Sequence, residues 1–356
     1  MGKNSKSSSN SSKTAPQASP PAGSARATND SILSIPLILI FILVPILSLL
    51  WTPEAPPRPF ALLRPKSAQD TPKLITPRIL LVTAHPDDEV IFAPTVLALL
   101  SAGDDGKAKA GYAGGGAVEK PVLWSVCLSM GDYGDDDGDE SAMVSAREKR
   151  GDVREAEWEK SWDVLGLKEE MRYILDVPTL RDNISAEWDP QEIANQVEPF
   201  IIKKSINTIL TFDHSGVTNH PNHRSLPHGI EHMLTSPSPS LAAYLRKPGT
   251  IAPRLFTLKT VPWYQHGTLS PVFTHLSLGA RMLLRMARSP SPSQNSMGTG
   301  PGMIDIPNTI FISDIKRYIR AWRALLQHRT QMGPRMIALA AWGKYVWVNE
   351  WVESVL

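Results

Sequence analysis

The chain has 356 residues, of which 37 are Lys or Arg and 35 are Asp or Glu. This near balance argues against a nucleic-acid-binding protein, and the length suffices for one large or two modest domains. The single cysteine, Cys127, excludes an internal disulfide and a zinc site built from cysteines, so any metal has to be held by histidine and carboxylate.

The first part of the chain is predicted to precede the folded domain. Residues 1–30 are rich in Ser, Ala, Pro and Asn, which is typical of a disordered tail. Residues 31–51 carry no charge, and because about 20 apolar residues cross a hydrocarbon core, we expect a transmembrane helix there rather than a signal peptide or a buried helix. Lys and Arg flank this segment on both sides, so charge does not orient it. Residues 52–73 are proline-rich and are predicted to form a linker to a domain that spans residues 74–356.

Strands and helices are predicted to alternate along that domain. The alternation indicates an α/β fold: a Rossmann-like layered sheet, mostly parallel, with helices on both faces. Ligands of such sheets collect beyond the carboxyl ends of the strands. Flexible insertions are expected near residues 102–120 and 288–303. The predicted strands are 79–84, 122–129, 172–177 and 206–212, and the predicted helices are 90–101, 144–165 and 190–204.

The first predicted strand runs directly into "AHPDDE", residues 84–89. These acids could simply begin the next helix, with Asp87 as its cap and Asp88 and Glu89 in its first turn, where the helix dipole favours negative charge. That interpretation leaves His85 without a role. Because His85 and Asp88 are three residues apart, a turn that leads into a helix can aim both side chains at one metal ion.

A second group of polar residues, "TFDHSGVTNHPNHRS", follows the fourth predicted strand. The carboxyl ends of parallel strands meet at one edge of the sheet, so His223 could reach the same point as His85 and Asp88. Two histidines and one carboxylate form the ligand set with which zinc hydrolases leave a position open for water.

Two neighbouring residues then have candidate catalytic roles. Asp87 could take a proton from a metal-activated water, and His220 could stabilise the oxyanion that forms when an amide is attacked. The alternative is a polar surface loop in which Asn219 or Asn222 caps a helix. We expect His214 to be a loop residue rather than a fourth ligand.

The sequence resembles the N-acetylglucosaminyl-phosphatidylinositol de-N-acetylases and their bacterial LmbE-like relatives. Four stretches between about residues 77 and 335 carry the resemblance: "AHPDDE", "GDVREAEWEKSWDVLGL", "TFDHSGVTNHPNH" and "QHRTQM". Two features depart from the family pattern: Asn222 stands where bacterial members usually carry Asp, and the acidic loop at residues 131–140 is long. The roles of this loop and of His328 and Arg329 stay open.

The resemblance implies zinc as the cofactor, although another divalent metal could replace it, and a role for each of six residues. Arg154 would bind the phosphate or inositol part of the substrate, although "REAEWEK" also fits a solvated helix face with charge pairs. The other roles are His85, Asp88 and His223 as metal ligands, Asp87 as general base and His220 as the histidine on the oxyanion side.

The implied reaction is hydrolysis of the N-acetyl group of N-acetylglucosaminyl-phosphatidylinositol to glucosaminyl-phosphatidylinositol and acetate, an early step of GPI-anchor biosynthesis. The implied location is the endoplasmic reticulum membrane, as a single-pass protein with a cytosolic catalytic domain, which agrees with the lone cysteine. The glycolipid and the membrane are the expected partners, nucleic acid is not, and no protein partner is indicated. Residues 276–288 fit either an interfacial helix or a core helix, and the aromatic carboxy-terminal stretch could likewise pack in the core or lie at the bilayer.

Two other functions stay open on the residues alone. The same acids could serve a metal-dependent phosphoesterase, which would hold a second metal ion about 3.5 to 4 Å from the first. A non-catalytic membrane adaptor could also retain the fold. The complete set of His85, Asp87, Asp88 and His223 speaks against a loss of activity.

Overall fold

The computed structural model describes residues 60, 62–64, 73–102, 120–132, 140–262, 309–334, 336–337 and 343–356. The predicted tail and transmembrane helix lie outside the described residues, as do most of the linker, the insertions predicted near 102–120 and 288–303, the stretch 276–288 and most of the acidic loop. Within the described part, none of the helices has the length and apolar character needed to cross a bilayer.

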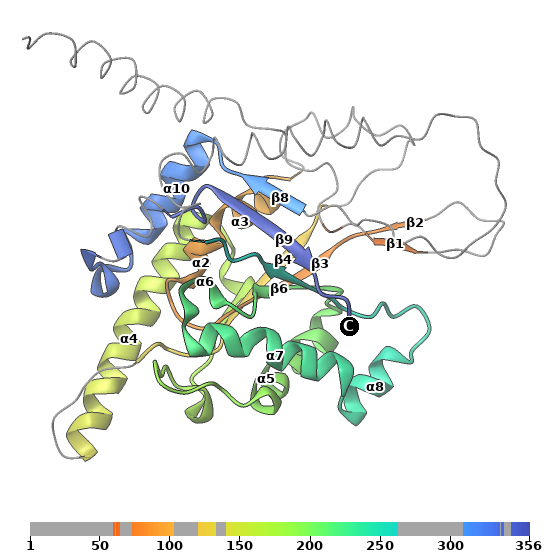
Figure 1. Ribbon diagram of the computed structural model, residues 1–356, viewed down its shortest axis with the longest axis horizontal. Helices are drawn as coiled ribbons and strands as arrows, with labels where there is room; N and C mark the ends of the chain where they lie inside the picture. The colour runs from red at the N-terminus through yellow and green to blue at the C-terminus, as the bar shows by residue number, and fades with distance from the viewer. Residues whose placement is uncertain are drawn as a thin grey trace, which may run out of the picture. The chain divides into compact units, whose positions relative to one another are not determined.

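The core of the fold is a seven-stranded sheet with the strand order β5-β4-β3-β6-β7-β9-β8 (Figure 1). β3, β4, β5, β6 and β7 run parallel, and β9 runs antiparallel to its neighbours β7 and β8. The predicted mostly parallel α/β sheet is therefore confirmed. The strands are β3 (Arg78–Thr83), β4 (Val122–Cys127), β5 (Arg172–Ile174), β6 (Thr208–Phe212), β7 (Arg254–Leu258), β8 (Thr309–Ile312) and β9 (Val348–Glu353), and a separate antiparallel pair comprises β1 (Leu62–Arg64) and β2 (Lys73–Ile75).

β3 lies in the middle of the parallel strands and is covered on both faces. Residues 79–83 are at most 1% exposed, and Ile79 pairs with Leu123 of β4 and Thr208 of β6. A strand buried on both faces needs a continuous apolar run rather than an alternating one, which is why residues 79–84 could be recognised as a strand from the sequence.

Helices cover the sheet in two sets, which Figure 1 shows with α5 and α7 along one side and α3 and α10 along the other. The helices α3 (Ala93–Ser101), α4 (Glu140–Leu165) and α10 (Ile315–Leu325) contact one another, and α5 (Pro190–Lys204) contacts α7 (Pro221–Thr235) and α8 (Pro239–Leu245). α5 begins and ends where the sequence predicts. Its cap, Asp189, accepts a hydrogen bond from the Gln191 amide at 2.9 Å.

The helix predicted over residues 90–101 is in fact two helices. A short helix, α2 (Asp88–Ile91), ends before Phe92, and α3 begins at Ala93 with Pro94 in its first turn. Proline lacks an amide hydrogen and fits best in the first turn of a helix, so the break falls just before it. Phe92 itself is fully buried against Phe212 and Trp351.

The strand order singles out the position between β3 and β6, where the chain changes the direction in which it crosses the sheet. From β3, the chain continues to β4 and β5 on one side, and then returns to β6 and β7 on the other. β3 and β6 are therefore neighbours whose connections leave in opposite directions, and sheets of this kind bind ligands at the carboxyl ends of such a strand pair. Both polar clusters of the sequence begin there, after Thr83 and after Phe212.

Candidate active site

The "AHPDDE" loop after β3 is folded by its own acids. Asp88 Oδ2 accepts hydrogen bonds from the amides of Ala84 and His85, both at 2.9 Å, and Glu89 Oε2 accepts one from the Asp87 amide at 3.0 Å. Asp87 has a φ of 106°, a left-handed conformation that is costly for a residue with a side chain. Asp87 occupies the cap position of α2, but its side chain makes no capping hydrogen bond. The capping interpretation of Asp87 is therefore wrong.

The second loop leads from β6 through the short helix α6 (Gly216–Asn219) into α7. His220 is the residue that caps α7, because its Nδ1 accepts a hydrogen bond from the Asn222 amide at 3.3 Å. The interpretation of Asn219 or Asn222 as the cap is therefore wrong. His223 lies in the first turn of α7 rather than at the strand end, so the helix brings it back over the sheet edge.

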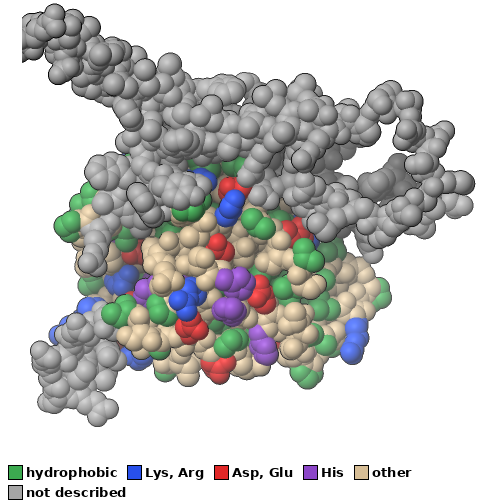
Figure 2. All heavy atoms as spheres, in the orientation of Figure 1, with side chains coloured by type: hydrophobic (Ala, Val, Ile, Leu, Met, Phe, Trp, Pro, Cys, Tyr) green, Lys and Arg blue, Asp and Glu red, His purple; other side chains and the backbone are tan. Residues whose placement is uncertain are grey.

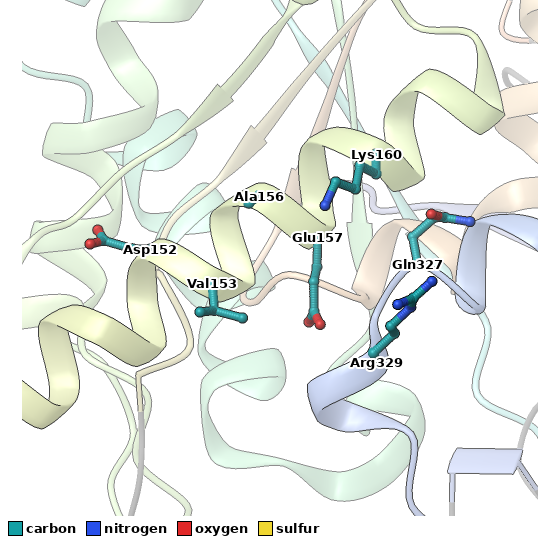
Figure 3. Close-up of a pocket in the computed structure, with 7 residues that line it drawn as sticks. All are labelled: Asp152, Val153, Ala156, Glu157, Lys160, Gln327 and Arg329. Carbon is teal, nitrogen blue, oxygen red and sulfur yellow. The ribbon is translucent and has the colours of Figure 1, made fainter.

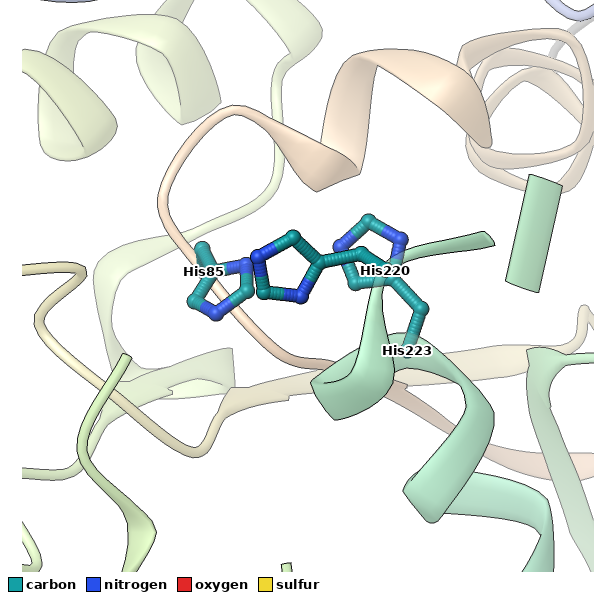
Figure 4. A group of neighbouring side chains, drawn as sticks. All are labelled: His85, His220 and His223. Atoms are coloured by element: carbon teal, nitrogen blue, oxygen red, sulfur yellow. The ribbon is translucent and has the colours of Figure 1, made fainter. Parts of the chain in front are cut away.

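These two loops bring three imidazoles together, as Figure 4 shows. One ring nitrogen from each of His85, His220 and His223 lies within 4.8 Å of the others. In Figure 2, histidine side chains gather near the middle of the visible surface, beside acidic and basic ones. This arrangement could hold a metal ion, since imidazole nitrogens at such separations need only small shifts to meet one cation.

Hydrogen bonds around His85 leave one of its nitrogens available. His85 Nε2 lies 3.1 Å from Asn222 Oδ1 and 3.2 Å from Asp182 Oδ1. Both partners are acceptors, so Nε2 carries the hydrogen and Nδ1 keeps its lone pair. The orientation of the Asn222 amide follows from its Nδ2, which donates to the Ala186 carbonyl at 3.1 Å. That donor explains why Asn rather than Asp suits position 222, because a carboxylate has no hydrogen to give to this carbonyl.

His223 and Asp88 face each other through one atom of each side chain that has no backbone hydrogen bond. His223 Nδ1 donates to the Gly216 carbonyl at 3.1 Å, and its ring stacks on Phe212. His223 Nε2 then lies 3.1 Å from Asp88 Oδ1. Burial raises the pKa of Asp88, but His223 and His85 outweigh it and bring that pKa below its ordinary value. A buried carboxylate oxygen and an imidazole nitrogen at this distance can share either a proton or a cation.

His220 differs from the other two histidines because its nitrogen without a hydrogen already accepts a backbone hydrogen bond. Its Nδ1 is the acceptor of the Asn222 amide, so the hydrogen sits on Nε2, which lies 3.6 Å from Asp182 Oδ1. Burial, followed by the neighbouring His85 and His223, lowers the pKa of His220 to about 4. At neutral pH this side chain is therefore an uncharged N–H donor.

The pKa of Asp87 is shifted in the opposite direction from that of the adjacent Asp88. Burial raises the pKa of Asp87 to about 6, against the opposing charge of Arg154. Asp87 Oδ2 lies 3.7 Å from Arg154 Nη2, and each of the two side chains is about 15% exposed. A carboxylate with its pKa close to neutrality suits a group that accepts and returns a proton.

Arg154 of α4 reaches into the same space. Its Nη1 donates to the Gly131 carbonyl and lies 3.7 Å from Asp182 Oδ2, and its Nη2 donates to the Pro86 carbonyl at 3.1 Å. The interpretation of this residue as part of a solvated helix face is therefore wrong. The structure thus brings all six predicted site residues into one region.

Asp182 is a member of this region that sequence reasoning missed. Its carboxylate contacts His85, His220 and Arg154. Burial by itself lowers the pKa of His85, but the hydrogen bond and the charge of Asp182 outweigh it, so that pKa is raised. The available signal was weak: Asp182 follows β5, whose carboxyl end lies at the same sheet edge, but "LRDN" carries no recognisable motif.

A buried ion pair supports the "AHPDDE" loop from behind. Glu89 Oε1 lies 2.5 Å from His328 Nε2 and accepts a hydrogen bond from Ser161 Oγ of α4 at 2.5 Å, and neither Glu89 nor His328 is exposed. Burial by itself lowers the pKa of His328, but Glu89 outweighs it, so the pKa is raised. His328 belongs to the "QHRTQM" stretch, to which sequence reasoning assigned no role.

A separate cavity of about 530 Å³ lies along α4 and the segment that follows α10 (Figure 3). It contains none of the six predicted site residues. α4 therefore directs Arg154 toward Asp87 and Asp182, and directs other side chains, such as Glu157 and Lys160, toward this cavity. The lining residues are Asp152, Val153, Ala156, Glu157, Lys160, Gln327 and Arg329.

Both clusters lie within a stretch of the chain that matches a known family. Residues 80–234 match the PIG-L family, described as GlcNAc-PI de-N-acetylase. The N-acetylglucosaminyl-phosphatidylinositol de-N-acetylase of Bos taurus is 31% identical over 150 residues, which cover 42% of this chain and 47% of that protein. The protein of the same name from Arthroderma benhamiae is 28% identical over 313 residues, which cover 78% of this chain and 88% of that protein.

A solved structure, the N,N'-diacetylchitobiose deacetylase from Pyrococcus horikoshii, is similar with a TM-score of 0.46 and 18% identity, and the match covers 78% of this chain and 83% of that one. The chain spans about half the length of the bovine relative that it matches.

Proposed function

We propose, from the match of residues 80–234 to the PIG-L family, that this chain hydrolyses the N-acetyl group of N-acetylglucosaminyl-phosphatidylinositol. The products are glucosaminyl-phosphatidylinositol and acetate, in an early step of GPI-anchor biosynthesis. The names of the curated relatives support the substrate. The observation that carries the proposal is the meeting of His85, His220 and His223 beside the buried Asp88, at the carboxyl ends of β3 and β6.

The donor set fits zinc. Nδ1 of His85, Nε2 of His223 and Oδ1 of Asp88 are the atoms that their other hydrogen bonds leave available, and they match the two-histidine, one-carboxylate set of zinc hydrolases. When bound, zinc would polarise the amide carbonyl and lower the pKa of water from about 15.7 toward 7. Another divalent transition metal could serve with the same donors.

The chain's own residues supply the proton transfers. Asp87 takes the proton of the attacking water and returns it to the leaving amine, because it lies beside the proposed ligand Asp88 and its surroundings favour the proton more than those of Asp88 do. His220 donates its Nε2 hydrogen to the developing oxyanion, a role that its uncharged tautomer permits. Asp182 holds His85 in the tautomer that leaves Nδ1 free.

Arg154 is proposed to bind the phosphate or inositol part of the substrate. Its guanidinium lies beside Asp87 and Asp182, so it also offsets the negative charge of those acids before the substrate arrives. A guanidinium can turn one face to phosphate while it keeps a contact to a carboxylate, because it has five N–H groups in a fixed fork.

Residues 31–51 are proposed to anchor the chain in the endoplasmic reticulum membrane, with the catalytic domain on the cytosolic side. Their length and lack of charge support this assignment, and a glycolipid substrate requires an enzyme at the bilayer.

One assay tests the proposed function. The detergent-solubilised full chain is incubated with the acetylated glycolipid, with and without a chelator, and the free amine is measured. We expect amine and acetate in equal amounts, loss of both with the chelator, and recovery after zinc is added back. Binding of the glycolipid without amine release would contradict the proposal, as would release of phosphate in place of acetate.

A further inference from the structure

Another group of potential metal ligands lies on the surface, outside the candidate active site. His214, His228 and Glu231 each offer one ligand atom, and these atoms lie within 4.8 Å of one another. His214 Nε2 is 3.0 Å from Glu231 Oε1, and the rings of His214 and His228 are 4.5 Å apart. Both histidines are exposed, and neither is used in the proposed hydrolysis.

The backbone that carries these three residues is held in place. His214 lies in the turn after β6, where Asp213 Oδ1 accepts hydrogen bonds from the amides of Ser215 and Gly216, and Asp213 Oδ2 accepts one from the Thr260 amide at 2.6 Å. His228 and Glu231 are three residues apart on α7, so they share one face of that helix. Only side-chain rotations are then needed to bring three donors around one ion.

We propose that His214, His228 and Glu231 form a second metal site, which binds Zn²⁺ or a similar transition-metal ion. Two imidazoles and a carboxylate favour such ions over Mg²⁺ and Ca²⁺, which prefer oxygen donors. Zinc ligands lie about 2.0 to 2.2 Å from the ion, so donors now within 4.8 Å need to approach one another only modestly. Because the site is open to solvent, water completes the coordination.

An ion at this site would join the turn after β6 to α7. His214 is two residues before Gly216, whose carbonyl accepts the hydrogen bond of His223 Nδ1 at 3.1 Å. The same connection therefore carries His223 of the candidate active site and the surface cluster. Binding here is expected to stabilise this connection, because an ion that binds only the folded arrangement shifts the equilibrium toward it.

The site is tested by counting metal equivalents on the full chain in detergent. Any polyhistidine tag is removed first, since it binds the same ions. Zn²⁺ or Co²⁺ is titrated by equilibrium dialysis into the wild type, into His228→Gln and into His232→Gln. His232 is a matched control, because it is a histidine on the same helix whose Nε2 faces Gln191 instead of the cluster.

We expect His228→Gln to bind one equivalent fewer than the wild type, and His232→Gln to bind the same number. Glu231→Gln should keep the site but weaken it by about 10-fold or more, since even groups that only orient a ligand are worth about 10 to 100-fold in affinity. Equal numbers of equivalents in the wild type and His228→Gln, at all ion concentrations, would overturn the proposal. The test uses the difference in bound equivalents between the wild type and His228→Gln. Metal bound at the candidate active site is the same in both proteins and cancels from this difference.

Discussion

Two adjacent acids, Asp87 and Asp88, show how the surroundings of a residue decide its chemistry. Asp88 is buried and Asp87 largely so, and burial raises the pKa of each. Asp88 faces His223 and accepts two backbone amides, so its pKa falls below the ordinary value. For Asp87, burial outweighs the opposing charges of Arg154 and His328, and its pKa rises to about 6. One acid is therefore suited to bind a cation and the other to exchange a proton.

Substitutions of the two acids should have different effects on metal and on turnover. Asp88→Ala removes a proposed ligand, so zinc content and turnover should both be lost. Asp87→Asn keeps the shape and the ligands, so zinc should stay bound while turnover falls by about 10² to 10⁴-fold, the usual contribution of a positioned acid or base. Metal analysis of both purified variants checks the assignment, and equal zinc occupancy in the two would refute it.

The raised pKa of Asp87 also predicts a dependence of stability on pH. Its pKa is about 6 in the folded chain and about 3.9 in an unfolded one. The folded state holds the proton more tightly, so this residue lowers the free energy of unfolding as the pH rises from about 4 to 6, and the full cost remains above that range. In metal-free protein at pH 7, Asp87→Asn should therefore raise the free energy of unfolding, by up to about 3 kcal/mol.

The measurement is urea unfolding of the metal-free wild type and Asp87→Asn at pH 4 and pH 7. The difference between the two proteins should grow with pH. A constant difference would show that Asp87 keeps its ordinary pKa when the chain folds.

Arg154 is expected to affect substrate use more than metal binding. Arg154→Ala removes a guanidinium that can contact phosphate and that lowers the pKa of Asp87, so kcat/KM should fall while zinc stays bound. Arg154→Lys should recover only part of the loss, because an ammonium cannot reproduce the bidentate geometry. Steady-state kinetics beside metal analysis measure both effects, and unchanged kinetics would remove Arg154 from the site.

At the scale of elements, the Glu89–His328 pair joins α2 to the segment after α10. The two residues are 239 positions apart, and both are fully buried. Ser161 ties the same carboxylate to α4. The "AHPDDE" loop is thus tied to two other elements, α4 and the segment after α10, which helps to hold Asp87 in its left-handed conformation.

Removal of one partner from this pair should be costly. Glu89→Ala leaves the raised-pKa imidazole of His328 without its counter-charge, and loss of one member of a buried pair costs about 3 to 5 kcal/mol. Glu169→Ala is the matched control, because Glu169 is exposed and such changes stay within about 0.5 kcal/mol. Urea unfolding of both variants checks the prediction. A loss of similar size in both would show that the buried pair contributes no more than a surface charge.

At the scale of the whole molecule, the domain should be separable from its amino-terminal part. Phe60 is 3% exposed and packs against Phe256 at 4.9 Å between ring centroids, so a truncation has to end before it. We expect a chain without residues 1–52 to fold and to hydrolyse a soluble substrate analogue. Its activity on bilayer substrate should drop, because the proposed anchor confines enzyme and lipid to one surface.

Two measurements on the truncated chain test this prediction: circular dichroism for folding, and amine release from soluble and bilayer substrates. Equal activity of the full and truncated chains on bilayers would argue against an anchor in residues 1–52. Failure to fold would show that this segment is part of the core.

The sequence by itself determined the class of fold and the position of both clusters along the chain. Apolar runs identify β3 and β6, and the caps and amphipathic pattern of residues 190–204 define α5 to the residue, because these signals come from neighbours in the chain. Alternation of strands with helices then predicts a mostly parallel sheet, whose strand ends lie along one edge. That reasoning was enough to expect His85 and His223 near each other.

Only the tertiary structure decided what each of these side chains contacts. His85 meets Asn222 across 137 positions and also Asp182, contacts that depend on the order of strands and on the path of loops outside any local pattern. The same holds for the left-handed Asp87, which the surrounding elements hold against its own preference. Hydrogen bonds between distant residues fix which nitrogen of a histidine keeps its lone pair. The division of the histidines into metal ligands and proton donors therefore depends on the tertiary structure and not on the sequence pattern.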